Sequence, residues 1–251
     1  PFERSRRYAV GNVADLLALG FDPDKGYIYQ QSKEQRVKDL AIMFGRGVTL
    51  ATMKAIYGER HMGLYLSALI QAGDILLPQQ KDFGGPKPTV VPVGIDQDPH
   101  LRLTRDLAFK FRRRYNFIPP SSTYHKLIKA LDGSPKMSKR APMSYFTLEE
   151  KPEVIAKKIS NAFTGGRPTA EEQRRLGANP DICPLYDLYL FHFFERDEDA
   201  VKLYNYECKG GKILCGEDKQ RLVKIVTEFV KEHQRKRRQS IDKAREILEV
   251  E

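Results

Sequence analysis

Hydrophobic residues recur at helical spacing through the first part of the chain, with short apolar runs between the helical segments. Val10, Val13 and Leu17 share one face of a helix that ends before Gly20. The same reasoning predicts helices at about 32–44, 49–57 and 61–72, and strands at 27–30 and 89–93. We expect the second strand to be buried. Helices that alternate with strands are typical of a layered α/β fold.

The last hundred residues or so show only helical periodicity. Pro152 suits the first turn of a helix that buries Ile155 and Phe163 and that Gly165 and Gly166 end. We expect the later apolar stripes to form a core rather than contacts with a cofactor. The patterns predict two domains, an α/β domain at 1–144 and an all-α domain at 145–251. The first is expected to be incomplete at its amino-terminal end, because only two convincing parallel strands precede residue 100.

Composition narrows the class of protein. The chain has 251 residues, of which 41% are hydrophobic, which is enough for a substantial core. Lys and Arg number 43 against 33 Asp and Glu, and this net charge of +10 favours a polyanionic partner, although basicity also serves solubility. Cys183, Cys208 and Cys215 lack the spacing of a disulfide framework or a zinc site, which favours a reducing compartment. No apolar run has the ~18 residues of a membrane span. We therefore expect a cytoplasmic protein with no membrane partner.

The most specific motif is Lys136-Met137-Ser138-Lys139-Arg140, which follows a Gly-Ser-Pro run. Such a sequence predicts a mobile loop whose ammonium groups bind an anion, and a polyphosphate suits it best. The alternative is a solvated surface loop that happens to carry two lysines.

A second motif, Gly94-Ile95-Asp96-Gln97-Asp98-Pro99, follows the strand predicted at 89–93. Asp98 is expected to cap a helix that has Pro99 in its first turn. Gly94, Asp96 and Gln97 would then lie at the carboxyl end of a parallel strand, where open α/β sheets bind ligands. In the alternative reading Asp98 only caps the helix and Asp96 is solvated.

Both motifs resemble those of one enzyme family. The loop is similar to the KMSKS loop of class I aminoacyl-tRNA synthetases, with Arg140 where those enzymes usually have serine. The stretch 91–106 resembles tryptophanyl-tRNA synthetases of the archaeal and eukaryotic type, and the similarity extends to 68–72, 161–167 and 184–191. The resemblance implies a Rossmann-like nucleotide-binding domain followed by a helical anticodon-binding domain. It also implies ATP-dependent activation of tryptophan, transfer to tRNA(Trp), and a homodimer.

The resemblance also assigns roles to residues. It implies Lys136, Ser138 and Lys139 as catalytic residues that hold the leaving pyrophosphate, and Gly94, Asp96 and Met137 as ATP-binding residues. It implies Gln71, Gln97, Val91 and Val93 as tryptophan-binding residues. Magnesium would bridge the phosphates of ATP and would need no metal cage made of protein side chains. Two basic clusters are candidates for binding tRNA, although each also suits a solvated helix end: Arg112, Arg113 and Arg114, and Arg235, Lys236, Arg237 and Arg238.

The chain departs from the family in one important respect. It has no HIGH-like histidine signature, because His61 lacks a partner histidine and is predicted to be a surface or turn residue. We therefore expect the chain to begin partway through a longer protein and to catalyse poorly by itself. Ser67 stands where some relatives have a phenylalanine near the tryptophan pocket. The alternatives are a non-catalytic, synthetase-derived protein that binds RNA or protein, and a tyrosine-specific relative.

Overall fold

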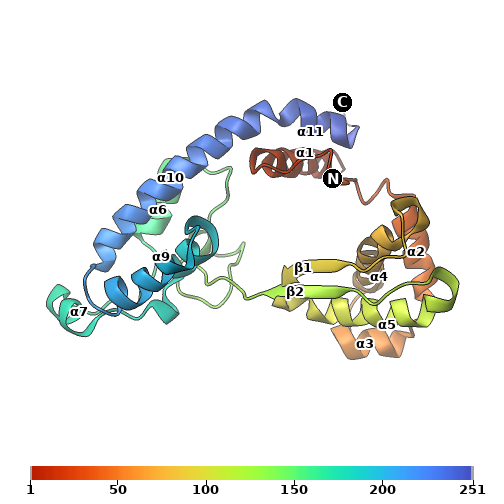
Figure 1. Cartoon of the computed structure of the whole chain (residues 1–251), viewed down its shortest axis with the longest axis horizontal. Coiled ribbons are helices and arrows are strands. Elements are labelled where there is room, and N and C mark those ends of the chain that lie inside the picture. The colour runs from red at the N-terminus through yellow and green to blue at the C-terminus, as the bar shows by residue number, and fades with distance from the viewer. Residues whose placement is uncertain (1, 250–251) are drawn as a thin grey trace. The chain divides into compact units, whose positions relative to one another are not determined.

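The computed structural model describes residues 2–249, which form two compact units (Figure 1). One unit is Ile28–Leu127, and the other joins the segment that ends at Tyr27 to the segment that begins at Ile128. Among the described residues, no helix combines the length and apolar character that a membrane span needs. The boundary predicted at residue 144 concerns functional domains and stays a prediction.

Unit Ile28–Leu127 holds the sheet. Its two strands are parallel, with Val90 opposite Ser121 and Gly94 opposite His125. Helix α4 packs against both α2 and α5, and their buried faces share one apolar core that includes Phe44. The elements are α2 (Gln35–Gly45), α3 (Leu50–Tyr57), α4 (Met62–Leu76), β1 (Val90–Gly94), α5 (Asp98–Tyr115) and β2 (Ser121–His125).

The helices of this unit confirm the predictions, and the strands correct them. Residues 27–30 form no strand, and the Tyr29 hydroxyl instead donates to the Asp74 carboxylate at 2.6 Å. Strand β1 pairs on one side only within the described residues, so it is not buried, and Val90 is 64% exposed. Among the described residues, β1 is the only strand before residue 100, and the sequence pattern does not reveal its partner β2 because Ser121–His125 is short and largely polar.

The other unit is helical. Its longest helix, α10, lies beside α6 (Figure 1), and an apolar stripe on α10 covers the buried Ile155 and Ile159 of α6. Helix α6 ends earlier than predicted because the Asn161 side chain caps it by donating to the Lys157 carbonyl at 2.8 Å. Phe163 therefore lies outside the helix and is 42% exposed rather than buried. The elements are α1 (Phe2–Ala18), α6 (Pro152–Ser160), α7 (Ala170–Leu176), α8 (Pro184–Leu188), α9 (Asp197–Lys202), α10 (Cys215–Gln239) and α11 (Ile241–Leu248).

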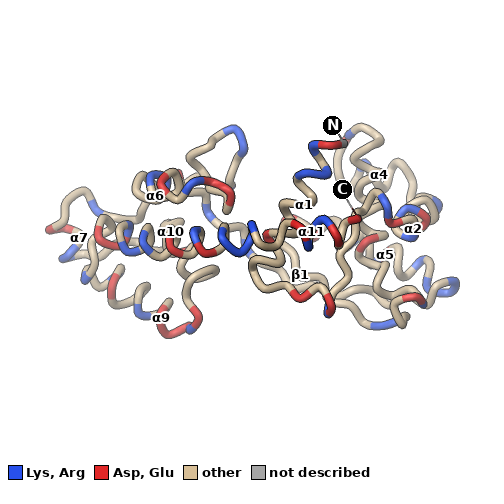
Figure 2. Tube along the Cα trace, turned by 90° about the horizontal axis from the view of Figure 1, so that it is seen from above, with Lys and Arg blue, Asp and Glu red and all other residues tan. Residues whose placement is uncertain are grey.

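A buried polar cluster fastens α1 to α10. The Asp15 carboxylate lies 2.8 Å from Nε2 of His233 and 2.7 Å from Nε of Arg237, and Arg237 also pairs with Glu149. The side chain of His233 is 1% exposed and those of Asp15 and Arg237 about a fifth. Figure 2 shows Lys and Arg recurring along α10, and at Arg237 that charge is used inside the fold.

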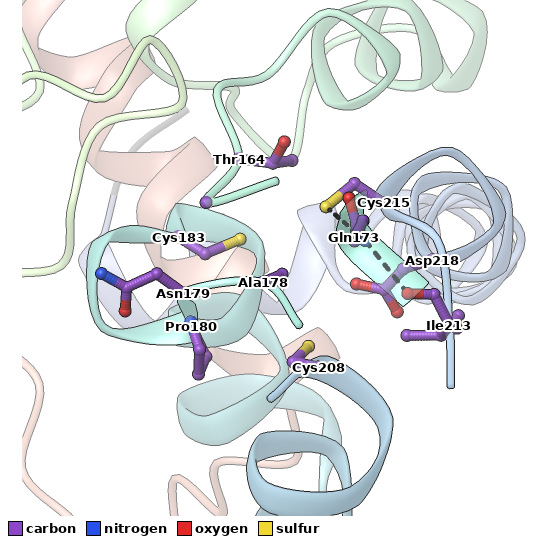
Figure 3. A pocket seen from close by; sticks show the side chains of 11 residues that line it. Thr164, Gln173, Ala178, Asn179, Pro180, Cys183, Cys208, Ile213, Cys215 and Asp218 are labelled. Atoms are coloured by element: carbon purple, nitrogen blue, oxygen red, sulfur yellow. Dashed lines mark hydrogen bonds between the residues drawn. The ribbon is translucent and has the colours of Figure 1, made fainter. Parts of the chain in front are cut away.

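The cysteines line a small, mostly apolar pocket whose wall includes residues of α7 and α10 (Figure 3). Cys183, Cys208 and Cys215 all contribute to its wall, together with Gln173 and Asp218. The amide of Gln173 donates to Sγ of Cys215 at 3.3 Å. Burial raises the pKa of the Cys208 thiol to about 12 and also raises that of Cys183. Within residues 2–249, no group of three or more His, Cys, Asp or Glu side chains is placed to hold a metal ion.

The Asp15 cluster predicts a stability effect. Asp15→Ala leaves His233 and Arg237 without their shared carboxylate, and we expect a loss of about 3 kcal/mol in the free energy of unfolding. Urea denaturation followed by circular dichroism measures it. Asp22→Ala, which removes an exposed pair with Lys25 and an exposed hydrogen bond from the Asp24 N–H, is the matched control and should cost less than about 1 kcal/mol. Equal unfolding midpoints for the two variants would contradict the structural role of Asp15.

The raised pKa of Cys208 predicts slow alkylation. At pH 8 a thiol with a pKa of about 12 is almost entirely protonated and therefore a poor nucleophile. Iodoacetamide should label Cys208 far more slowly in the folded chain than in urea, where the thiol pKa returns to about 8.5. Peptide mass spectrometry after timed quenching measures the two rates. Similar rates in both states would show that Cys208 is not shielded.

Candidate functional site

The carboxyl end of β1 gathers the residues of the second motif, as predicted. Strand β1 ends at Gly94, a single turn of 3₁₀ helix spans Ile95–Gln97, and α5 begins at Asp98. Gly94 permits this turn to be tight, because a Cβ atom at that position would lie 2.6 Å from the Asp96 carboxylate. The Asp96 carboxylate thus lies beside the end of the strand, and Asp96 is exposed.

Side-chain amides at this edge form a short polar row. Nε2 of Gln71, on α4, donates to Oε1 of Gln97 at 3.0 Å, and Nε2 of Gln97 donates to Asp96 at 3.3 Å. The fold thus brings together three predicted site residues that are up to 26 positions apart in the sequence. Val91 and Val93 alternate with exposed neighbours on β1, so both half-buried side chains face the same side of the strand.

Asp98 has a different position from the one predicted. Gln97 is the cap residue of α5, and Asp98 is the first residue of the helix, with Pro99 in the first turn as expected. The Asp98 carboxylate accepts a hydrogen bond of 2.6 Å from the Tyr124 hydroxyl and pairs with Arg102. The bond from Tyr124, helped by Arg102, lowers the pKa of Asp98. Asp98 therefore ties the end of β2 to α5 rather than capping the helix.

A second tie joins α3 to α5. The Tyr57 hydroxyl lies 3.0 Å from Nδ1 of His100, and the two rings are in contact. Burial lowers the pKa of His100 and raises the pKa of Tyr57 to about 12, which favours the neutral form of both groups at pH 7. Neither Tyr57 nor Tyr124 was found from the sequence, because each acts on α5 from a distant segment that carries no motif.

The cationic loop, residues 133–140, lies in the other unit. Gly133 opens it with φ +83°, and a Cβ atom there would meet the Phe163 ring at 2.8 Å, so glycine is required on both counts. Lys136, Ser138 and Lys139 are exposed, as predicted. In the part of the chain that the structure describes, the ammonium groups of the two lysines form no ion pair. The loop is therefore open to an anion.

Two features of the middle of this loop do not involve its charges. Met137 lines an apolar cavity of about 530 Å³ with Tyr145 and Phe146. The backbone N–H of Ser138 donates to the Ser144 hydroxyl at 3.0 Å. The Ser138 hydroxyl itself accepts from the backbone N–H of Arg140 at 3.2 Å and lies at the surface.

The two basic clusters differ in how many of their charges are available. Arg112, Arg113 and Arg114 occupy the exposed last turn of α5, where Arg112 packs over the Phe109 ring. On α10, by contrast, Arg235 and Lys236 share the Glu232 carboxylate, and Arg237 is held by Asp15 and Glu149. Arg238 is exposed at the end of the helix.

His61 caps α4, where its Nδ1 accepts from the Leu64 N–H, which confirms its prediction as a turn residue. The strand edge and the cationic loop belong to different units. The chain thus carries two groups of polar residues suited to phosphate and amino-acid ligands, each fixed by its own contacts.

Comparisons with known proteins identify the family. A family model described as tRNA synthetases class I (W and Y) matches residues 2–231. The tryptophan–tRNA ligase of Hyperthermus butylicus is 44% identical over 94% of this chain, and that of Methanocaldococcus jannaschii is 41% identical over 99%. This chain spans 64% of the length of the first relative and 68% of the second.

The fold agrees with the sequence comparison. The crystal structure of the tryptophanyl-tRNA synthetase from Aeropyrum pernix matches with a TM-score of 0.92 and 43% identity, over 98% of this chain and 67% of that one. The α/β fold with a small parallel sheet and a helical carboxyl-terminal region is the fold predicted from the sequence. The chain belongs to the class I tRNA synthetases, in the group that includes the enzymes for tryptophan and tyrosine.

Proposed function

We propose that this chain carries active-site residues of a tryptophan–tRNA ligase, which activates tryptophan with ATP and transfers it to tRNA(Trp). The observation that carries the proposal is the hydrogen bond from Gln71 to Gln97 at the carboxyl end of β1. These are the two amides expected to hold the amino end of tryptophan. The names of the relatives, both tryptophan–tRNA ligases, support tryptophan over tyrosine.

The first chemical step is an in-line displacement at the α-phosphorus of ATP. The carboxylate of tryptophan forms a new P–O bond, the bond to the bridging oxygen breaks, and pyrophosphate leaves with the electron pair. Lys136 and Ser138 stabilise the negative charge that develops on pyrophosphate, with Lys139 as a helper. Because the ammonium groups of Lys136 and Lys139 are unpaired in the described part of the chain, the loop pays no ion-pair penalty when it binds this charge.

The strand edge holds the other reactants. Gln71 and Gln97 bind the amino end of tryptophan, Val91 and Val93 line its side-chain pocket, and the carboxylate of Asp96 accepts from a ribose hydroxyl beside Gly94. Met137 contributes to binding ATP from the cationic loop. Magnesium would enter with ATP as part of the substrate and would offset the charge of its phosphates.

Transfer to tRNA is the second step of the proposed reaction. The exposed Arg113, Arg114 and Arg238 are the cations best suited to phosphate contacts, since the described structure gives them no ion pair. Their neighbours Arg112, Arg235 and Lys236 add charge to the same helix ends. Arg237 is the least available for contacts with phosphates, because it is paired with Asp15 and Glu149. The proposed enzyme is a homodimer and is located in the cytoplasm.

Removing the loop lysine tests the proposed role of the loop. Lys136→Ala should lower tryptophan-dependent exchange of labelled pyrophosphate into ATP by about 10²–10³-fold, the range for a lost transition-state donor. The assay uses the full product of the gene. Lys157→Ala, an exposed lysine on α6 in the same unit, is the matched control and should retain exchange.

The outcomes of this assay separate the alternatives. Exchange that depends on tyrosine instead of tryptophan would identify a tyrosine-specific relative. Absence of exchange in the unmodified protein, together with salt-sensitive RNA binding, would support a non-catalytic binding protein. Equal exchange by the two lysine variants would remove the loop from the mechanism.

The amide pair predicts a coupled effect on tryptophan binding. Gln71→Ala and Gln97→Ala should each raise KM for tryptophan about tenfold, which corresponds to about 1.4 kcal/mol. In the double variant KM for tryptophan should rise by less than the product of the two single effects, because the two side chains are hydrogen-bonded to each other. KM for ATP serves as the internal comparison. Gln35→Ala, on the exposed face of α2, is the control, and strictly multiplicative losses would contradict a shared site.

A further inference from the structure

Ser144 directs a fully buried hydroxyl at the exposed cationic loop. It closes the 3₁₀ turn Pro142–Ser144 and is 0% exposed. Its Oγ accepts from the backbone N–H of Ser138 at 3.0 Å and donates to the backbone carbonyl of Ser138 at 3.2 Å. One hydroxyl thus engages both backbone polar groups of a single loop residue.

Ser144 is itself held by the interior of its unit. Its carbonyl accepts from the N–H of Leu131, a residue of the apolar core, at 2.8 Å. The next residue, Tyr145, offers its carbonyl to the buried Lys158 of α6 at 2.9 Å, and Lys158 also pairs with Glu150 at 2.7 Å. The Ser144 hydroxyl therefore connects the loop to a segment that is itself fixed to the core and to α6.

Folding alone does not require this arrangement. A buried hydroxyl needs one hydrogen-bond partner, and a carbonyl of its own turn commonly provides it. Ser138 is an exposed residue, and its carbonyl already accepts from the backbone N–H of Ala141 at 2.9 Å without Ser144. The pair of bonds fixes the loop at the residue that the proposed function places on pyrophosphate.

We propose that Ser144 is a positioning residue of the cationic loop. It fixes the peptide of Ser138 so that the side chains of Lys136 and Ser138 face the leaving pyrophosphate, while their charges and donors stay free. This inference rests on the proposed function for its catalytic consequence, but the hold on the loop is testable by itself.

The hold is tested by hydrogen exchange. In Ser144→Ala the Ser138 N–H loses its acceptor, and its amide exchange should become about tenfold faster, in line with one lost hydrogen bond. Ser240→Ala removes another hydroxyl that bonds to a backbone carbonyl, that of Lys236, and should leave the Ser138 amide unchanged. Circular dichroism confirms that both variants fold. Unchanged exchange at Ser138 in Ser144→Ala overturns the proposal.

The catalytic consequence is tested by a double-mutant cycle on pyrophosphate exchange. Ser144→Ala should lower kcat/KM for ATP about tenfold in the unmodified protein and have little effect beside Lys136→Ala, because both act through the same loop. KM for tryptophan should not change. If the two substitutions lower kcat/KM for ATP by independent factors that multiply, or if Ser144→Ala changes KM for tryptophan, the positioning role is overturned. An unmodified protein without exchange would overturn the proposed function instead, and the amide exchange of Ser138 would still decide whether Ser144 holds the loop.

Discussion

Neutral contacts hold the cationic loop, and this leaves its charges available. The Ser144 hydroxyl engages the backbone, Met137 lines an apolar cavity, and Gly133 fits closely against the Phe163 ring. The one carboxylate at the start of the loop, Asp132, accepts from Ser134 rather than from a lysine. A carboxylate paired with Lys136 would anchor the loop equally well but would compete with a phosphate for the same ammonium group.

The strand edge separates anchoring from binding in a similar way. Asp96 and Asp98 are two positions apart, yet Asp98 is bound by Tyr124 and Arg102, while Asp96 accepts a hydrogen bond from the neighbouring amide of Gln97 and stays exposed. The lowered pKa of Asp98 reflects its structural use. Asp96 and Asp98 are the same type of residue, but their different exposure and partners suit them to different roles. The residue type alone does not reveal this difference.

The sequence predicted the helices, the polar residues that follow β1 and the exposed loop, because each depends on local spacing or on a turn. It failed where distant segments decide the outcome. Tyr27–Gln30 has the composition of a strand, but Tyr29 is held by Asp74 on α4 instead. Tyr124 and Ser144 carry no motif, and their importance follows only from what lies opposite each hydroxyl in the fold.

The attachment of α1 to α10 through Asp15 and His233 makes one unit discontinuous, since Ile28–Leu127 is inserted between its two segments. Joining those segments requires closing a long loop, which carries an entropic cost that grows with loop length. Folding of the inserted unit turns that flexible tether into a compact body and shortens the effective loop. The topology therefore favours an order of folding in which Ile28–Leu127 forms early and the contacts of Asp15 form late.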